Sequence, residues 1–491
     1  MSNRKMTYGL TAFYVAVIFI AGCLPEPEDT LEWSADGSTG LLRTRGTLFL
    51  VDDQTGQLTE IAKQNVRPWP DISKDGGLIA YGREVECTNL AEGLKLLPAG
   101  QVEMIKYYAE WTRKNILDAG GLLQDKFPFP DKGPLNSGDY KNWAIRYMCE
   151  NADSELQRVL EDWGIQKGKE HVIRYYQVVA VPGDNIENKR IVTTSIFKIM
   201  ATRLSPNKKH VAYLICADDD MEYDLYIASL EGDIRAMRVD TYVAFGYDWR
   251  KDSKAIAYLD ADSVDNGDLI LGSLKERVVV DENGDLFVSP PEFSEQGMTQ
   301  THDCSTGASS LAGLIFYPWL KVQYGLGGRI FFSSCVLSLP MGEQDEPVWS
   351  LFCYDSITGT VVDMLPSDVS IYTRQIAGVT QFALSPDGKK LLLPIAENRF
   401  ICYEPATGSM DIPVEEDEQF GDEHAPQLIP SWKGNDEISF IVSGNSHFLP
   451  EAQREKGESE RREVIIIRDK ESRILSESWP DGMAEELNGF E

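Results

Sequence analysis

The sequence predicts an all-β fold in which a four-stranded unit is repeated about seven times. The first observation is a turn phrase, clearest in FALSPDGKKLLLPI (Phe382–Ile395), where Ser-Pro-Asp-Gly joins two apolar runs. The second is that degenerate copies of this phrase recur along the chain, roughly 40–50 residues apart where no insertion intervenes. The third is that most copies are followed by a second hairpin, which brings each unit to four strands.

Seven turns carry the repeat. They are Trp33–Gly37, Ile72–Gly76, Leu204–Lys209, Trp249–Lys254, Tyr324–Arg329, Leu384–Lys390 and Trp432–Glu437. A single four-stranded sheet cannot bury both of its faces, whereas sheets packed in a closed ring around an axis bury both. The predicted fold class is therefore a seven-bladed β-propeller of four-stranded blades, with a small α-helical insertion in blade two.

The repeat resembles that of a known family. The pattern S-P-D-G-K-x-[LI]-A-Y, followed by L-Y-x-x-D-x-x-[TG]-G, is similar to the TolB-like (WD-like) β-propeller repeat of bacterial envelope proteins. Leu384–Leu393 and Leu204–Leu214 match its first half best, and Asp224–Gly232 and Phe352–Gly359 match its second half. The turns YGLGGR and WKGNDE depart from it. The resemblance implies a propeller over residues 31–491.

The N-terminus has the pattern of an export signal. Arg4 and Lys5 precede an uncharged run, Leu10–Ile20, which ends in small residues and is too short for a permanent membrane span. The following IAGC resembles the lipobox of bacterial lipoproteins. The alternative is an ordinary signal peptide with a chance cysteine.

The lipobox resemblance implies a bacterial lipoprotein with three N-terminal features. Residues 1–22 would be a signal peptide, Cys23 would become the first residue and carry acyl chains such as palmitate, and residues 23–30 would be a tether. The expected location is the cell envelope. In a Gram-negative cell this means the outer membrane, facing the periplasm or the cell surface.

Charge and cysteine content narrow the choice of partners. The chain has 78 acidic and 47 basic residues, a net charge of −31, so nucleic acid is excluded as a partner because its binding needs basic side chains. Export would place the cysteines in an oxidising compartment. We expect disulfides between Cys335 and Cys353, on neighbouring strands, and between Cys87 and Cys149, which bracket most of the insertion.

Residues 87–168 interrupt the strand pattern of blade two. Apolar residues recur at helical spacing in Val102–Leu117 and in Ser154–Trp163, the second with Asp153 as N-cap, so we expect two to four helices. Tyr108 and Trp111 in the first helix are candidates for binding a partner. The alternative is that these aromatic side chains are buried and dock the helix onto the sheets.

Most other long connections fall between the second and third strands of a blade. They are Cys216–Asp224, Asp260–Asp268, Ser338–Trp349 and Ser443–Glu463. In a propeller these connections emerge on the same face as the insertion, while the Ser-Pro-Asp-Gly turns lie on the opposite face. We call these the elaborated face and the turn face. Loops on a rigid scaffold often carry function, so binding is expected at the elaborated face, with Trp349 as a further candidate. The alternative is that the long loops are tolerated by the fold and have no role in binding.

Catalytic and metal-binding motifs are scarce. The sequence has no G-x-S-x-G, G-x-x-x-x-G-K-[ST], H-E-x-x-H or C-x-x-C. Asp260, Asp262, Asp265 and Asp268 have oxygen ligands that suit calcium, but their spacing is not that of the calcium-binding loop, and the alternative interpretation as a β-turn is favoured. We expect no cofactor apart from this calcium option.

Two functions remain open. The first is a non-enzymatic envelope lipoprotein, anchored to the membrane by lipid, whose propeller binds a protein or glycan partner through the elaborated face. The alternative is a metal-dependent, polysaccharide-active enzyme, since some related propellers resemble sugar lyases with a metal-histidine centre. A fold alone does not decide between them.

Overall fold

The computed structural model describes most of the propeller but not the chain before residue 29. The described residues are 29–44, 46–120, 127–130, 138–165, 171–216, 223–232, 236–261, 272–290, 293–296, 298–303, 309–313, 320–336, 348–364, 382–395, 399–411, 430–443, 462–468 and 471–475. Within them, no helix combines the length and the apolar character needed to cross a bilayer.

The strands form antiparallel sheets in chain order. The first three sheets contain β1 (Asp29–Trp33), β2 (Thr39–Thr44), β3 (Thr47–Asp52) and β4 (Leu58–Ala62); β5 (Asp71–Ile72), β6 (Leu78–Cys87), β7 (Ile173–Pro182) and β8 (Arg190–Ser195); and β9 (Lys198–Leu204), β10 (His210–Cys216), β11 (Tyr223–Ser229) and β12 (Ala236–Asp240). The fourth contains β13 (Val243–Trp249), β14 (Ala255–Ala261), β15 (Gly272–Val278) and β16 (Phe293–Gln296).

The remaining strands form three further sheets. The fifth contains β17 (Met298–Asp303), β18 (Ser309–Gly313), β19 (Val322–Tyr324), β20 (Arg329–Val336), β21 (Val348–Asp355) and β22 (Thr360–Asp363), with a 3₁₀ turn, η1 (Leu326–Gly328), between β19 and β20. The last two contain β23 (Ala383–Leu384), β24 (Leu391–Ile395), β25 (Arg399–Glu404) and β26 (Ser409–Asp411); and β27 (Ser431–Lys433), β28 (Glu437–Ser443), β29 (Arg462–Arg468) and β30 (Glu471–Ile474).

The structure is a β-propeller of four-stranded blades, but the prediction of seven such blades is wrong. Over the described residues, six sheets have four strands and the fifth has six. In the fifth sheet, β17 pairs in parallel with the outer strand β22, and β18 pairs with β17. An outer strand presents unpaired backbone groups that can accept a further strand, so the segment between two blades has joined this edge.

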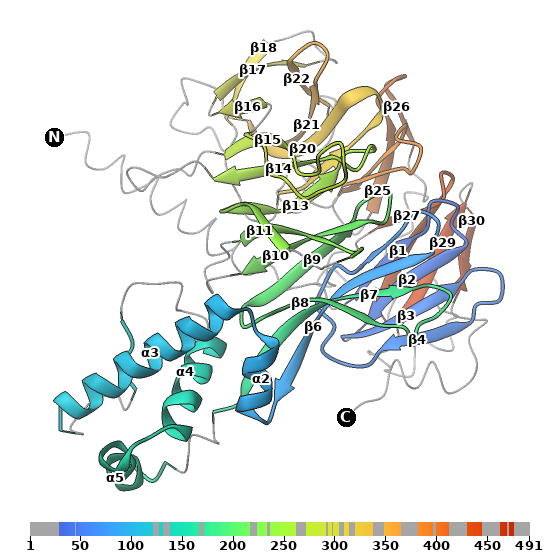
Figure 1. The fold of residues 1–491 in the computed structure, drawn as a ribbon. Helices are drawn as coiled ribbons and strands as arrows, with labels where there is room; N and C mark the ends of the chain where they lie inside the picture. The colour runs from blue at the N-terminus through green and yellow to red at the C-terminus, as the bar shows by residue number, and fades with distance from the viewer. Residues whose placement is uncertain are drawn as a thin grey trace, which may run out of the picture.

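Neighbouring sheets share hydrophobic cores around the ring. The first two meet at Leu41 and Ile79, and the fifth and sixth meet at Phe331 and Phe382. Figure 1 shows the N-terminal sheet, in blue, beside the C-terminal sheet, in red. Every blade takes its strands from one stretch of chain, so side-chain contacts rather than a shared sheet close the ring.

Four helices lie between β6 and β7. They are α2 (Leu90–Leu96), α3 (Ala99–Asp118), α4 (Gly138–Glu150) and α5 (Ser154–Asp162). The predicted N-cap of the last helix is confirmed, because the side chain of Asp153 accepts a hydrogen bond from Leu156 N at 3.0 Å. Figure 1 shows these helices beyond the ends of β6 and β7, away from the sheets.

The repeated turn phrase has a physical cause in its serine and its acidic or amide residue. In four turns the serine hydroxyl donates to the side chain two residues later at 2.7 Å: Ser34–Asp36, Ser73–Asp75, Ser205–Asn207 and Ser385–Asp387. The same hydroxyl accepts a hydrogen bond from the amide at the start of the next strand, as from His210 N to Ser205 Oγ at 3.0 Å. Gly388 has a φ of 70°, a conformation that glycine adopts without strain.

Candidate functional site

The helical insertion is firmly docked on blade two. Trp143 Nε1 donates to Arg174 O at 2.6 Å, and Tyr176 OH donates to Asp139 Oδ2 at 2.5 Å. Gln101 makes two further hydrogen bonds. Its Nε2 donates to Ser195 Oγ at 3.0 Å, and its Oε1 accepts from Ile196 N at 2.9 Å. Because the fully buried Trp143 also belongs to the core shared with β7, the insertion presents its outer surface from a fixed position.

The predicted binding residues on α3 are only partly available. Tyr108 is half-buried and packs edge-to-face against Tyr140, with ring centroids 5.1 Å apart, while Trp111 is also half-buried. The exposed aromatic side chain of the helix is Tyr107, at 63%. Tyr107 lies beside the charged residues Glu103, Lys106 and Glu110 on the outer side of α3, a position that helical spacing alone could have identified.

The third predicted binding residue, Trp349, lies in β21. The register places it opposite Cys335 of β20, close to the end where β20 and β21 are connected. Its side chain lies outside the part of the structure that is described. The strand order confirms that β20 and β21 follow β19 as adjacent strands of the blade.

The structure describes only the first of the four residues of the candidate calcium site. Asp260 lies in β14, is 4% exposed and forms an ion pair with Lys275 of the adjacent strand. Its carboxylate is therefore held by a lysine within the sheet. Asp262, Asp265 and Asp268 lie outside the described residues. Among the residues that are described, no cluster of three or more His, Cys, Asp and Glu side chains is arranged to hold a metal ion.

The predicted disulfide between Cys335 and Cys353 is wrong, although the two residues do lie on neighbouring strands. Cys353 pairs with Phe331 and Cys335 pairs with Trp349, so the cysteines are offset by four residues. That offset is about 13 Å along a strand, whereas a disulfide needs Cα atoms within about 7 Å. The sequence places the strands together but does not reveal their register.

The predicted disulfide between Cys87 and Cys149 is also wrong. Both residues are present as thiols. The Cys87 thiol donates to Asn89 O at 3.1 Å at the base of α2. Cys149 is buried in a different core, the one shared by α3, α4 and α5. Packing has therefore separated two cysteines that the sequence places at the two ends of one segment.

A second candidate site, not predicted from the sequence, lies where the first strands of the blades surround the propeller axis. In each first strand, the residue immediately before the turn phrase contributes to a ring that we call the axial ring. Its members in chain order are Glu32, Asp71, Arg203, Asp248, Gln323, Ala383 and Ser431. Three acidic residues and one arginine at equivalent positions are unusual for the interior of a protein.

Side chains of the axial ring link consecutive blades by accepting hydrogen bonds from backbone amides of the next blade. Asp71 Oδ2 accepts from Leu204 N at 2.6 Å, and Asp248 Oδ2 accepts from Tyr324 N at 2.8 Å. Gln323 Oε1 accepts from Leu384 N at 2.9 Å. In each case the acceptor belongs to one blade and the amide to the first strand of the next. These side chains satisfy edge amides that the sheets leave unpaired.

Ionisable groups in the axial ring are close together. Arg203 Nη1 lies 3.4 Å from Glu32 Oε1 and 3.5 Å from Asp71 Oδ1. Burial raises the pKa of Asp71 from 3.8 to about 8, although Arg203 acts in the opposite direction. Burial also raises the pKa of Asp248. Near the ring, burial lowers the pKa of Lys321 to about 8, and the charge of Arg203 lowers it further.

These contacts favour a structural role for the axial ring. Arg203 occupies the position between Glu32 and Asp71 that a cation would need, and Lys321 Nζ donates to Phe382 O at 2.6 Å. Arg203 is thus held between Glu32 and Asp71, and backbone amides of the next blades donate to Asp71, Asp248 and Gln323. Tertiary structure alone brings these residues together, because consecutive members of the ring are 39 to 132 residues apart along the chain.

Comparisons with known proteins do not define a family for this chain. No protein-family model and no curated protein sequence matches the chain. Among solved structures it is similar to an oligogalacturonate lyase in complex with manganese, at 9% identity and a TM-score of 0.45, covering 91% of this chain and 89% of that one.

Two further likenesses cover less of the chain. A protein assigned as TolB from Agrobacterium tumefaciens is 13% identical, with a TM-score of 0.32, over 59% of this chain and 84% of that one. The acylaminoacyl peptidase of Pyrococcus horikoshii is 12% identical, with a TM-score of 0.36, over 61% of this chain and 41% of that one. The chain therefore spans less than half the length of the peptidase. Likeness at this level carries no argument about activity.

Proposed function

We propose that this protein is a non-enzymatic envelope lipoprotein whose propeller is a rigid scaffold for binding a protein or glycan partner. In this proposal residues 1–22 are a signal peptide, Cys23 carries the lipid and residues 23–30 form the tether. Binding takes place at the elaborated face, and nucleic acid is not a partner. The cell envelope is the corresponding location.

One observation carries the proposal: a docked helical unit stands on an otherwise regular scaffold. Propeller stability needs short connections only, as the two-residue connection between β2 and β3 shows. The connection between β6 and β7 instead holds four helices with their own core, formed by residues such as Ile116, Ile145 and Leu156. An added surface held this rigidly loses little conformational entropy when it binds a partner.

Photo-crosslinking in the living cell tests this proposal. A photoreactive amino acid is placed at Glu110, which is exposed on α3, and in a second chain at Ile357, which is 81% exposed in a turn of the turn face. We expect a specific crosslinked envelope protein or glycan from position 110 and not from position 357. Equal capture from the two positions would remove the support for the elaborated face.

Metal analysis of the purified protein separates the proposal from the alternative of a metal-dependent, polysaccharide-active enzyme. A stoichiometric transition metal, retained through purification, would favour the enzyme. Mass spectrometry of the mature N-terminus tests the lipid anchor separately, because an acylated residue 23 is expected. An unacylated chain that starts upstream of Cys23 would contradict the anchor.

A further inference from the structure

The chain enters the propeller on the same face as the helical insertion. Asp29, the first residue of β1, pairs with Thr44 at the end of β2, next to the connection between β2 and β3. Gly46 O in that connection accepts from Val66 N at 2.9 Å. Val66 in turn pairs with Arg83 of β6, four residues before Cys87, where the strand ends and the insertion begins. Continuous backbone contacts therefore connect the start of β1 to the base of the insertion.

The distance from the lipid to this point is short. Asp29 lies six positions after Cys23 in the sequence. A fully extended chain spans at most about 3.6 Å per residue, so six residues reach roughly 20 Å. Helix α3 alone has 20 residues and is about 30 Å long. A bilayer that holds acyl chains on Cys23 would lie within reach of the insertion.

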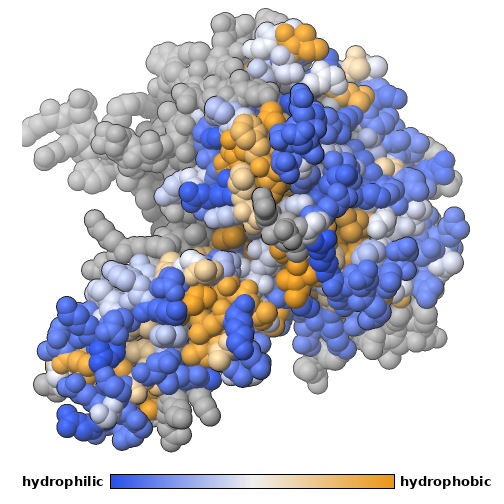
Figure 2. Space-filling view, viewed as in Figure 1, coloured by the Kyte–Doolittle hydropathy of each residue, from blue (hydrophilic) through white to orange (hydrophobic). Residues whose placement is uncertain are grey.

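The surface of the insertion suits a lipid headgroup layer. Leu96 at the end of α2 is 49% exposed, and Tyr107 is 63% exposed. Figure 2 shows hydrophobic residues gathered on the visible face at the helices. A tyrosine with its apolar ring and polar hydroxyl is suited to the boundary between acyl chains and water.

The charge distribution favours the insertion, rather than the rest of the propeller, as the part that approaches a membrane. Residues 87–168 contain 12 acidic and 10 basic residues, a net charge of −2, whereas the whole chain has a net charge of −31. Anionic lipids repel the acidic remainder of the propeller more strongly than they repel the insertion. The nearly neutral part is therefore the part that can approach the membrane.

We propose that the short tether holds the elaborated face against the membrane, with Leu96 and Tyr107 of the insertion in contact with the lipid headgroup layer. This inference rests on the lipid anchor of the proposed function. The turn face, with its Ser-Pro-Asp-Gly turns, then points away from the bilayer. A protein or glycan bound by the elaborated face would have to be located at the membrane surface.

Oxidative footprinting of the lipidated full-length protein tests the orientation. The protein is reconstituted into vesicles of phosphatidylethanolamine and phosphatidylglycerol, exposed to hydroxyl radicals and analysed by mass spectrometry. The reference is the unlipidated Cys23→Ser chain mixed with the same vesicles. We expect oxidation of Tyr107 and Leu96 to fall roughly threefold, because a residue at the interface loses most of its contact with water.

Residues of the turn face provide the internal control. Met410, in β26 next to the turn after β25, is 41% exposed and Ile357 is 81% exposed, and we expect both to be oxidised equally in the two chains. A chain with about 30 flexible residues inserted between Glu28 and Asp29 should remain on the vesicles and lose the protection of Tyr107, because its tether spans roughly 30 Å on average.

The possible failures are distinguishable. If Cys23 carries no lipid, the anchor of the proposed function fails. If the protein is acylated and bound to vesicles but Tyr107 is oxidised as in the Cys23→Ser chain, the orientation is refuted while the anchor stands. Equal protection with short and long tethers would overturn the tether as the cause.

Discussion

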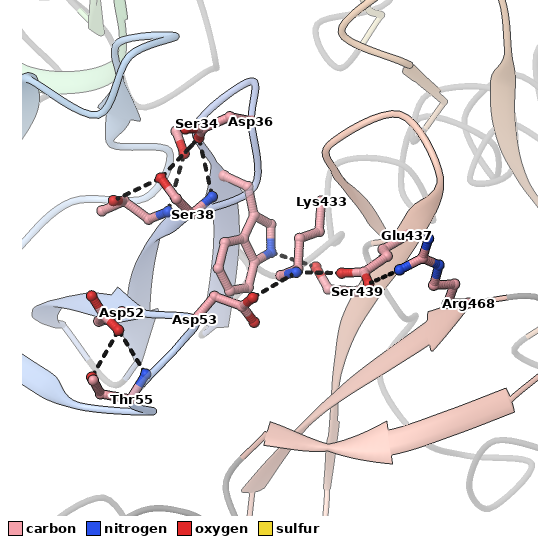
Figure 3. A network of polar contacts seen from close by, with 12 residues as sticks. Ser34, Asp36, Ser38, Asp52, Asp53, Thr55, Lys433, Glu437, Ser439 and Arg468 are labelled. Atoms are coloured by element: carbon pink, nitrogen blue, oxygen red, sulfur yellow. Dashed lines mark hydrogen bonds and ion pairs between the residues drawn. The ribbon is translucent and has the colours of Figure 1, made fainter.

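Replacing Lys433 by methionine should weaken the closure of the propeller ring. Lys433 lies where the last blade meets the first, and its side chain is 6% exposed. Its Nζ lies 3.0 Å from Asp53 Oδ2 of the first blade and pairs with Glu437 of its own blade. The same nitrogen lies 5.4 Å from the centroid of the Trp33 ring. Figure 3 shows Lys433 between the two carboxylates.

The size of the effect follows from what the substitution leaves behind. Methionine has a similar volume but no charge, so Asp53 and Glu437 lose the cation that they share. Glu437 keeps Arg468, which lies 3.7 Å away. Removing one partner of a fully buried ion pair costs about 3–5 kcal/mol. The two carboxylates remain 21% and 17% exposed, and water screening reduces the expected cost to about 2–3 kcal/mol.

Thermal unfolding followed by tryptophan fluorescence measures the loss. With an unfolding entropy of about 2.1 cal/mol/K per residue over about 460 residues, a loss of 2–3 kcal/mol lowers Tm by roughly 2–3 °C. Lys389→Met is the matched control, because Lys389 is 64% exposed and contacts Asp387 at 3.3 Å on the turn face. If Lys433→Met lowers Tm no more than this control, our account of ring closure is wrong.

Three further predictions concern the axial ring, the turns and the cysteines. Burial raises the pKa of Asp71 to about 8, so the folded chain keeps a proton that the unfolded chain releases, and stability falls as pH rises from about 4 to about 8. Asp71→Asn should flatten this part of the pH dependence, and equal slopes of urea midpoint against pH for both chains would contradict it. Ser385→Ala should cost about 1–2 kcal/mol in urea unfolding, because Lys390 N loses its acceptor and Lys389 N keeps only Asp387. Ser409→Ala, at an exposed position, should change the stability little. Alkylation in denaturant without reductant should modify both Cys87 and Cys149. In the folded chain Cys87 should react more slowly, because burial raises the pKa of its thiol. Alkylation of the two cysteines that occurs only after reduction would show a disulfide instead.

Local patterns in the sequence were enough to predict the repeated unit. The hydrogen bond from a serine to the side chain two residues later depends on neighbouring residues only, so the turn phrase predicts the hairpin at Ser34, Ser73 and Ser385. The N-cap at Asp153 is local for the same reason. The alternation of apolar residues then predicts strands, and their number predicts stacked sheets.

Register and edge pairing were beyond these patterns. The strands of Cys335 and Cys353 were placed side by side correctly, but only the pairing of Phe331 with Cys353 shows that the two thiols are four residues apart in register. The parallel pairing of β17 with β22 likewise depends on an exposed edge that exists only after the blade has formed. Such contacts have no counterpart in short stretches of sequence.

The sequence by itself therefore determined the turns and the repeated four-stranded unit, because these depend on hydrogen bonds and apolar spacing within a few residues. Tertiary structure alone decided which distant residues meet. Trp33 donates to Ser439 at 2.7 Å across 406 residues, and Asp71 meets Arg203 only because two first strands face one axis. Contacts at such separations depend on the geometry of ring closure, which packing of all the blades together establishes.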